Sequence, residues 1–217
     1  MAERISPDSP SFKNSWFRLR KGFIPWVSFK GNPYRKAFFR RYEWVSQYSD
    51  GVRVLDVPCG MGWGTSLIKG SSELVGMDLA EDAISEAQNR YGNLARFILG
   101  SMASFPFEEN SFEVVACLEG IEHVPQDVGD QFIHESHRVL SKNGLLLISS
   151  PHTKSGQHSG NEFHIYEYST EEIRRKLEMK FNVIDFYQLP VGNLIVDYFT
   201  CSKSSSCDTE NITNNQN

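Results

Sequence analysis

The chain has 217 residues, 40% hydrophobic and 23% charged, which is enough for one domain with a sizeable core and too few for two average domains. No stretch approaches the ~18 to 20 consecutive apolar residues of a membrane-spanning helix, and the N-terminus lacks the apolar segment of a signal peptide. The four cysteines follow neither metal-binding nor disulfide spacing. We therefore expect a cytoplasmic protein without a structural zinc site.

The formal net charge of −5 conceals an uneven distribution. Residues 1–41 hold ten Lys or Arg and two acidic residues, so the rest of the chain carries about −13. Aromatic residues alternate with the basic ones, a pattern that suits nucleic-acid bases, a membrane surface or a lid over a pocket. We interpret residues 1–33 as a basic aromatic arm or lid whose rings pack on the acidic body while its Lys and Arg stay in water.

Beyond the arm, hydrophobic periodicity alternates between helical spacing and short β-branched runs. Helices are predicted over 34–48, 81–90, 127–140 and from 169, where Ser169 and Glu172 form a capping-box pattern. Strands are predicted over 52–57, 73–77, 96–99, 112–118, 145–149, 181–189 and 194–201. This order indicates a parallel sheet, and the short connection 190–193 makes the last two strands an antiparallel hairpin. One domain over 34–201 is expected, followed by a disordered tail over 202–217.

Three glycines, Gly60, Gly62 and Gly64, stand at alternate positions where the first strand is expected to turn into a helix. A dinucleotide site normally reads GxGxxG, whereas this loop reads GxGxG and has Asp56 four positions before its first glycine. A carboxylate disfavours a phosphate and favours a cation. The loop therefore suits an amino-acid moiety whose ammonium group binds the carboxylate.

Three further strand ends carry side chains suited to a nucleoside. Asp78 ends the second strand 22 residues after Asp56, where a ribose diol would be bound. Ser101 and Met102 follow the third strand and would contact an adenine, while the fourth strand ends near the reactive centre. These ends should line one crevice, as in other open α/β sheets.

Four segments, VLDVPCGMGWGT, VGMDLA, FPFEENSFEVVACLEGIEHV and RVLSKNGLLLISSP, resemble class I S-adenosylmethionine-dependent methyltransferases, and the quinone, sugar and lipid group in particular. The resemblance covers about residues 34–201 and implies an α/β, Rossmann-like three-layer sandwich. Its sheet would have seven mostly parallel strands in the order 3-2-1-4-5-7-6, with strand 7 antiparallel.

The implied cofactor is S-adenosyl-L-methionine, converted to S-adenosyl-L-homocysteine. The implied cofactor-binding residues are Asp56, Pro58, Gly60, Gly62, Asp78, Leu79, Ser101, Met102 and Leu118. Ser101 replaces an Asp of many relatives, and Pro58 replaces a Gly.

Methyl transfer from a sulfonium is an in-line displacement, so positioning should supply most of the acceleration. A hydroxyl acceptor also benefits from a base, and we name His123, His164 and Glu119 as candidate catalytic residues, with His123 the leading base. His134 and His137 lie within a predicted helix and are interpreted as surface or packing residues. The resulting prediction is a metal-free transferase acting on a hydroxyl oxygen of a small molecule. Residues 1–33 and 151–168 should cover that acceptor, and the arm is compatible with peripheral membrane contact.

An alternative rests on Glu119, Glu122, His123 and His164, which resemble the metal ligands of small-RNA 3′-terminal 2′-O-methyltransferases. Such a set suits Mg²⁺ or Mn²⁺ on a ribose diol, but similar motifs occur in metal-free relatives, and the acidic body disfavours a polyanionic groove. Two rivals from other classes are an NAD-dependent oxidoreductase, disfavoured by the glycine spacing, and a non-catalytic binding module, disfavoured by the intact motifs.

Overall fold

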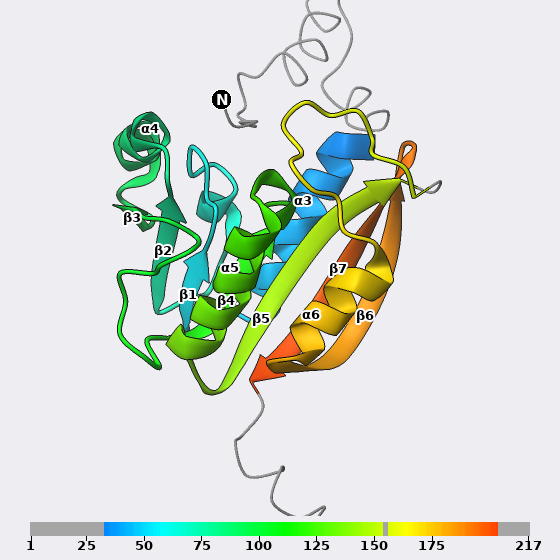
Figure 1. Cartoon of the computed structure of the whole chain (residues 1–217). Coiled ribbons are helices and arrows are strands. Elements are labelled where there is room, and N and C mark those ends of the chain that lie inside the picture. The colour runs from blue at the N-terminus through cyan, green and yellow to red at the C-terminus, as the bar shows by residue number, and fades with distance from the viewer. Residues whose placement is uncertain (1–32, 154–155, 204–217) are drawn as a thin grey trace, which may run out of the picture.

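The computed structural model describes residues 33–153 and 156–203 (Figure 1). The predicted arm over 1–33 and tail over 202–217 lie outside the described residues, except that Pro33 opens a helix and the last strand runs to Lys203. The helices are α3 (Pro33–Ser46), α4 (Glu81–Tyr91), α5 (Gln126–Val139) and α6 (Thr170–Glu178), with 3-10 turns η2 (Thr65–Leu67) and η3 (Ile121–His123). The strands are β1 (Arg53–Asp56), β2 (Glu73–Asp78), β3 (Arg96–Leu99), β4 (Phe112–Leu118), β5 (Leu140–Thr153), β6 (Phe181–Val191) and β7 (Leu194–Lys203).

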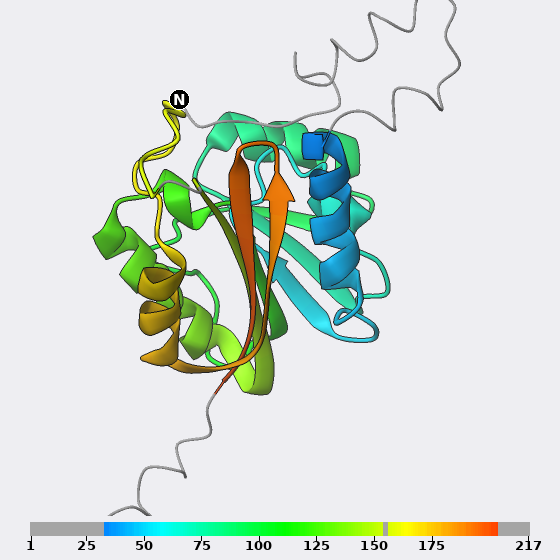
Figure 2. The ribbon, with the colours of Figure 1, turned by 90° about the vertical axis from the view of Figure 1, so that its right-hand side faces the viewer.

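The seven strands form one sheet in the order β3-β2-β1-β4-β5-β7-β6, which confirms the predicted topology. β1 to β5 are parallel to one another, and β7 runs antiparallel to both β5 and β6. The sheet separates α5 and α6 on one side from α3 on the other, as the view from the β6 edge shows (Figure 2). Because β1 to β4 are parallel, their carboxyl ends meet at one edge of the sheet.

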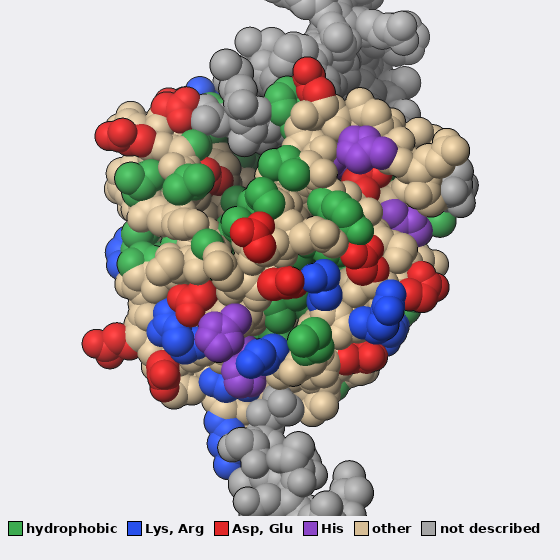
Figure 3. Space-filling model, in the orientation of Figure 1, with side chains coloured by type: hydrophobic (Ala, Val, Ile, Leu, Met, Phe, Trp, Pro, Cys, Tyr) green, Lys and Arg blue, Asp and Glu red, His purple; other side chains and the backbone are tan. Residues whose placement is uncertain are grey.

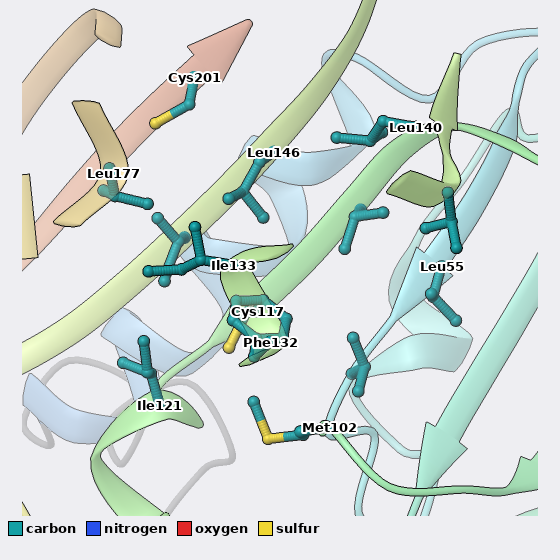
Figure 4. Close-up of a cluster of buried hydrophobic side chains, with 14 of the residues drawn as sticks. Leu55, Met102, Cys117, Ile121, Phe132, Ile133, Leu140, Leu146, Leu177 and Cys201 are labelled. Atoms are coloured by element: carbon teal, nitrogen blue, oxygen red, sulfur yellow. The ribbon is translucent and has the colours of Figure 1, made fainter. Parts of the chain in front are cut away.

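The core lies on both faces of this sheet. On one face, Leu55 of β1 and Cys117 of β4 pack with Phe132 and Ile133 of α5 (Figure 4). Met102 belongs to the same cluster, so the loop after β3 is anchored in the core. A second cluster joins α3 and α4 to the opposite face. The loops at the carboxyl edge therefore stand on two packed layers.

Two elements differ from the sequence-based expectation. The helix predicted after the glycine loop is only the 3-10 turn η2, because few residues separate it from the turn at Gly70 (φ +84°). Tyr42 of α3 also packs so closely on Gly64 that a Cβ there would lie 1.9 Å from its ring. The strand predicted over 145–149 extends from Leu140 to Thr153, because Leu140 pairs with Phe112 of β4 and β7 continues the ladder to Thr153.

The N-terminal cap predicted for the last helix is confirmed by the local geometry. Ser169 caps α6, its hydroxyl oxygen accepting a 3.3 Å hydrogen bond from the Glu172 amide. Cys59, Cys117 and Cys201 are buried and unbonded to one another. No helix in the described ranges is long and apolar enough to cross a membrane.

Candidate functional site

A cavity of about 420 Å³ opens at the carboxyl edge of β1 to β4. Its wall combines the strand ends with α3 on one side and with the loop before α6 on the other. The predicted site residues on this wall are Pro58, Gly60, Asp78, Leu79, Ser101, Met102, Leu118, Glu119, His123 and His164. The predicted cofactor end and the predicted catalytic end therefore share one cavity.

Asp78 joins the end of β2 to the glycine loop. Its Oδ2 accepts a 2.8 Å hydrogen bond from the Gly60 amide, and its Oδ1 accepts one of 3.0 Å from the Ala80 amide. Each carboxylate oxygen has a second lone pair, so Asp78 can support the loop and accept from a ribose diol together. Leu79, beside it, is 72% exposed and gives the cavity rim an apolar surface.

Asp56 and Gly62 were predicted to bind the cofactor, yet neither lies on the cavity wall. Asp56 is 1% exposed and its Oδ2 accepts a 2.6 Å hydrogen bond from the Thr65 hydroxyl. Burial raises the pKa of Asp56 to about 7. Gly62 (φ +75°) faces α4 and β3, where a Cβ would lie 2.7 Å from Ala87 and Phe97. Both residues support the glycine loop on the side away from the cavity wall, and their direct contact with a cofactor stays a prediction.

Glu119 has a partner that the sequence did not indicate. It adopts φ +51°, an uncommon conformation for a non-glycine residue, and pairs with Arg41 of α3 at 3.0 Å. The Arg41 side chain is only 6% exposed, and its guanidinium lies 5.0 Å from the ring centre of Phe38. This pairing makes Glu119 the counter-ion of a buried cation, a role different from the predicted catalytic one.

Glu122 and His123 lie in η3, directly below the predicted reactive centre. Glu122 is fully buried, and among the described residues its Oε1 has no hydrogen-bond partner. Burial, reinforced by the Glu119 charge, raises the pKa of Glu122 well above its usual range. The Nδ1 of His123 lies 2.9 Å from the Phe163 carbonyl oxygen. A carbonyl only accepts, so Nδ1 carries a proton and Nε2 carries the lone pair of the neutral ring.

His164 reaches the same place from the loop before α6. Its ring centre lies 5.1 Å from that of His123, and its Nδ1 lies 2.5 Å from Oε1 of Glu167. One ligand atom from each of Glu122, His123 and His164 lies within 4.8 Å of the others. Burial acts to raise the pKa of Glu167, but hydrogen bonds from Ser159 and His164 outweigh it and hold that pKa below its usual value.

Of the four remaining histidines that the structure describes, His158 lies beside His164, with their ring centres 6.4 Å apart, and the other three lie elsewhere. His134 is exposed on α5, and His137 packs on the Phe181 ring at 5.4 Å, as their interpretation as surface and packing residues requires. His152 lies 3.3 Å from Asp197 of β7. None of the three borders the cavity.

Sequence reasoning missed the contribution of α3. Phe38, Arg41 and Tyr42 all face the cavity. Their spacing places them on one helix face, which was a usable signal. Periodicity alone, however, does not show whether such a face meets a core or a ligand.

Residues 54–144 match a protein-family profile described as "Methyltransferase domain". A Mycolicibacterium smegmatis protein named as an S-adenosylmethionine-dependent methyltransferase is 31% identical over 150 residues, which are 65% of this chain and 57% of that protein. These matches and the strand order together support a class I S-adenosylmethionine-dependent methyltransferase fold for this chain.

Other proteins that this chain resembles in sequence or in fold differ in the acceptors that their names state. The ubiquinone biosynthesis O-methyltransferase of Hydrogenovibrio crunogenus is 26% identical over 56% of this chain and 50% of its own length. A Streptomyces coelicolor geranyl diphosphate C-methyltransferase, solved with Mg²⁺, a substrate analogue and S-adenosyl-L-homocysteine, has a TM-score of 0.66 at 14% identity, covering 76% of each chain. The chain spans about half the length of the curated relatives it matches.

The Asp78 geometry predicts a large loss of cofactor affinity in Asp78→Ala. Removing the ribose contact together with the support of the Gly60 amide should cost about 2 to 3 kcal/mol, or ~30-fold or more in affinity for S-adenosylhomocysteine. Calorimetric titration measures this, with Asp82→Ala, an exposed carboxylate on α4, as the matched control. Unchanged affinity in Asp78→Ala would refute the cofactor assignment.

Asp56 predicts a pH-dependent stability. Its pKa rises from 3.8 to about 7, so between these values the folded chain holds more protons on Asp56 than the unfolded chain. The stability contributed by this group therefore falls as pH rises through that window. Asp56→Asn mimics the protonated form and keeps an acceptor for Thr65, so its Tm should rise relative to wild type between about pH 4 and pH 7 and the difference should then stay constant. A pH-independent Tm difference in thermal melts would contradict this.

Proposed function

We propose that this domain transfers the methyl group of S-adenosylmethionine to a hydroxyl oxygen of a small-molecule acceptor. The observation that carries the proposal is the single cavity whose wall runs from Asp78 and Met102 to the imidazoles of His123 and His164. The first pair suits the ribose and adenine of the cofactor. The second pair suits the proton of a hydroxyl group.

The reaction is a displacement at the methyl carbon. The acceptor oxygen forms a bond to the methyl group while the bond from methyl to the sulfonium sulfur breaks, which leaves S-adenosylhomocysteine and a methyl ether. The acceptor proton goes to an imidazole and then to solvent. Because the attacking oxygen, the methyl carbon and the sulfur must lie in line, the walls contribute mainly by holding the acceptor and excluding water.

His123 is the proposed base. The Phe163 carbonyl oxygen holds its Nδ1 at 2.9 Å, so the lone pair of the neutral ring is on Nε2. Apolar side chains of Leu118, Val124 and Val128 form neighbouring wall. Such walls suit a hydrophobic or aromatic acceptor that carries a hydroxyl group. The name of the Hydrogenovibrio relative, an O-methyltransferase of ubiquinone biosynthesis, supports the same class.

A transfer assay tests the proposal directly. Wild-type protein should methylate hydroxylated aromatics in a panel that also contains carbon and amine acceptors. His123→Ala should lower turnover by ~10²-fold or more with little change in S-adenosylhomocysteine affinity, because a base acts on the acceptor and not on the cofactor. His134→Ala, the exposed histidine of α5, is the control. An unaltered rate in His123→Ala would remove the base role from this residue.

A second candidate is a divalent-metal-dependent 2′-O-methyltransferase acting on an RNA 3′ end. The observation that favours it is the close approach of Glu122, His123 and His164, with a buried carboxylate oxygen that lacks a partner among the described residues. One carboxylate and two imidazoles fit Mn²⁺ or Mg²⁺, which would polarise a ribose hydroxyl when bound. Against it, Glu119, the fourth expected ligand, pairs with Arg41. On the face formed by α5 and α6, acidic and basic side chains are also interspersed (Figure 3).

Titration of Mn²⁺ into protein saturated with S-adenosylhomocysteine separates the two candidates. The metal-free proposal predicts no binding beyond weak surface association. The metal-dependent candidate predicts binding that Glu122→Gln abolishes and that Glu119→Gln leaves within about threefold, because Glu119 is not among the three clustered ligands. Binding lost in Glu122→Gln would direct the acceptor screen to RNA 3′ ends and vicinal diols.

A further inference from the structure

The segment before α6 holds His164 in a defined place on the cavity wall. The His164 amide donates a 3.1 Å hydrogen bond to the Asn161 carbonyl oxygen. The two following amides, of Ile165 and Tyr166, donate to the Glu122 carbonyl oxygen at 2.8 and 3.1 Å. The backbone on both sides of His164 is therefore fixed, one side by its own turn and the other by η3. Only the rotation and the protonation of the imidazole are left to be determined.

The contact with Glu167 bears on both the rotation and the protonation of the His164 imidazole. Its Oε1 lies 2.5 Å from Nδ1 of His164, and the two side chains are 5% and 6% exposed. Ser159 holds the same carboxylate from the other side, since its amide donates to Oε2 at 2.9 Å and its hydroxyl donates to Oε1. His164 borders the cavity whereas Glu167 does not, so the carboxylate approaches the ring from the loop side. The His164 ring therefore has the Glu167 carboxylate on its loop side and the cavity on its other side.

The chemistry of this contact selects one tautomer. A carboxylate accepts hydrogen bonds and does not donate them, so Nδ1 of His164 must carry the proton. Nε2 of the neutral ring then carries the lone pair. Burying a carboxylate against an imidazole at the cavity wall points to control of that imidazole.

We propose that Glu167 is a positioning residue that fixes the tautomer and orientation of His164, so that the Nε2 lone pair of His164 faces the acceptor. The inference rests on the proposed function in one respect, namely that the acceptor occupies this end of the cavity. The lone pair accepts a hydrogen bond from a polar group of the acceptor other than the reacting hydroxyl, whose proton goes to His123, and so orients the acceptor toward the methyl group. Glu167 itself touches neither the acceptor nor the cofactor.

Heteronuclear NMR of the imidazole nitrogens tests the tautomer without any activity measurement. Spectra recorded at about pH 8.5, where an unperturbed imidazole is neutral, should show His164 with the proton on Nδ1. The signal is assigned by its loss in His164→Asn. In Glu167→Gln the Nδ1–H population should fall to about half or less, because an amide donates as well as accepts and no longer enforces one tautomer. Glu162→Gln, an exposed glutamate of the same segment, should match wild type.

Kinetics supply the second readout. Glu167→Gln should lower kcat ~10-fold or more while the affinity for S-adenosylhomocysteine stays within about twofold, because the change acts only on the acceptor side. A wild-type spectrum with the proton on Nε2, or an unchanged tautomer in Glu167→Gln, would overturn the inference, and the wild-type result does so even where the variant fails to fold. A protein that shows the expected tautomers but transfers no methyl group would refute the proposed function and leave the positioning role standing.

Discussion

The structure depends on the parallel arrangement of β1 to β4, which brings four carboxyl ends to one edge of the sheet. Loops at this edge have no strand to pair with, so their backbone and side-chain groups are available to a ligand. The hydrogen bond between Asp78 and the Gly60 amide links the end of β2 to the loop after β1 and so helps to fix the position of the glycine loop. Every other part of the site is built onto this frame.

Two segments outside the parallel strands complete the cavity. α3 supplies Phe38, Arg41 and Tyr42 from one side, and the segment before α6 supplies His164 from the other. Both are tied to the turn that follows β4, the first through the pair of Arg41 with Glu119 and the second through bonds to η3. The end of β4 is therefore the point where the proposed cofactor half and the proposed acceptor half of the cavity are connected.

The negative charge at this edge of the sheet is reduced in two ways, by an ion pair and by the burial of carboxyl groups. Arg41 neutralises Glu119 directly. Asp56 and Glu122 are buried, and the raised pKa values of both carboxyl groups favour their neutral forms over a wider pH range than in water. A cavity with this balance attracts a polyanion less than a basic groove would. This balance is consistent with the proposed neutral acceptor with hydroxyl groups and with one small cation.

Local pattern alone predicted most of the strands and helices, the reversed final hairpin, and the placement of Asp78, Ser101, Met102 and His123 at one edge, but not the 3-10 turn after the glycine loop or the length of β5. The predicted features follow from the period of the apolar residues and from the parallel topology that short connections impose. Only the tertiary structure decided that Asp56 is buried against Thr65, that Glu119 pairs with a helix 78 positions earlier, and that Glu167 lies against the ring of His164. The physical reason is that burial and hydrogen-bond partners are properties of the packed chain, and no spacing rule specifies which distant side chain fills them.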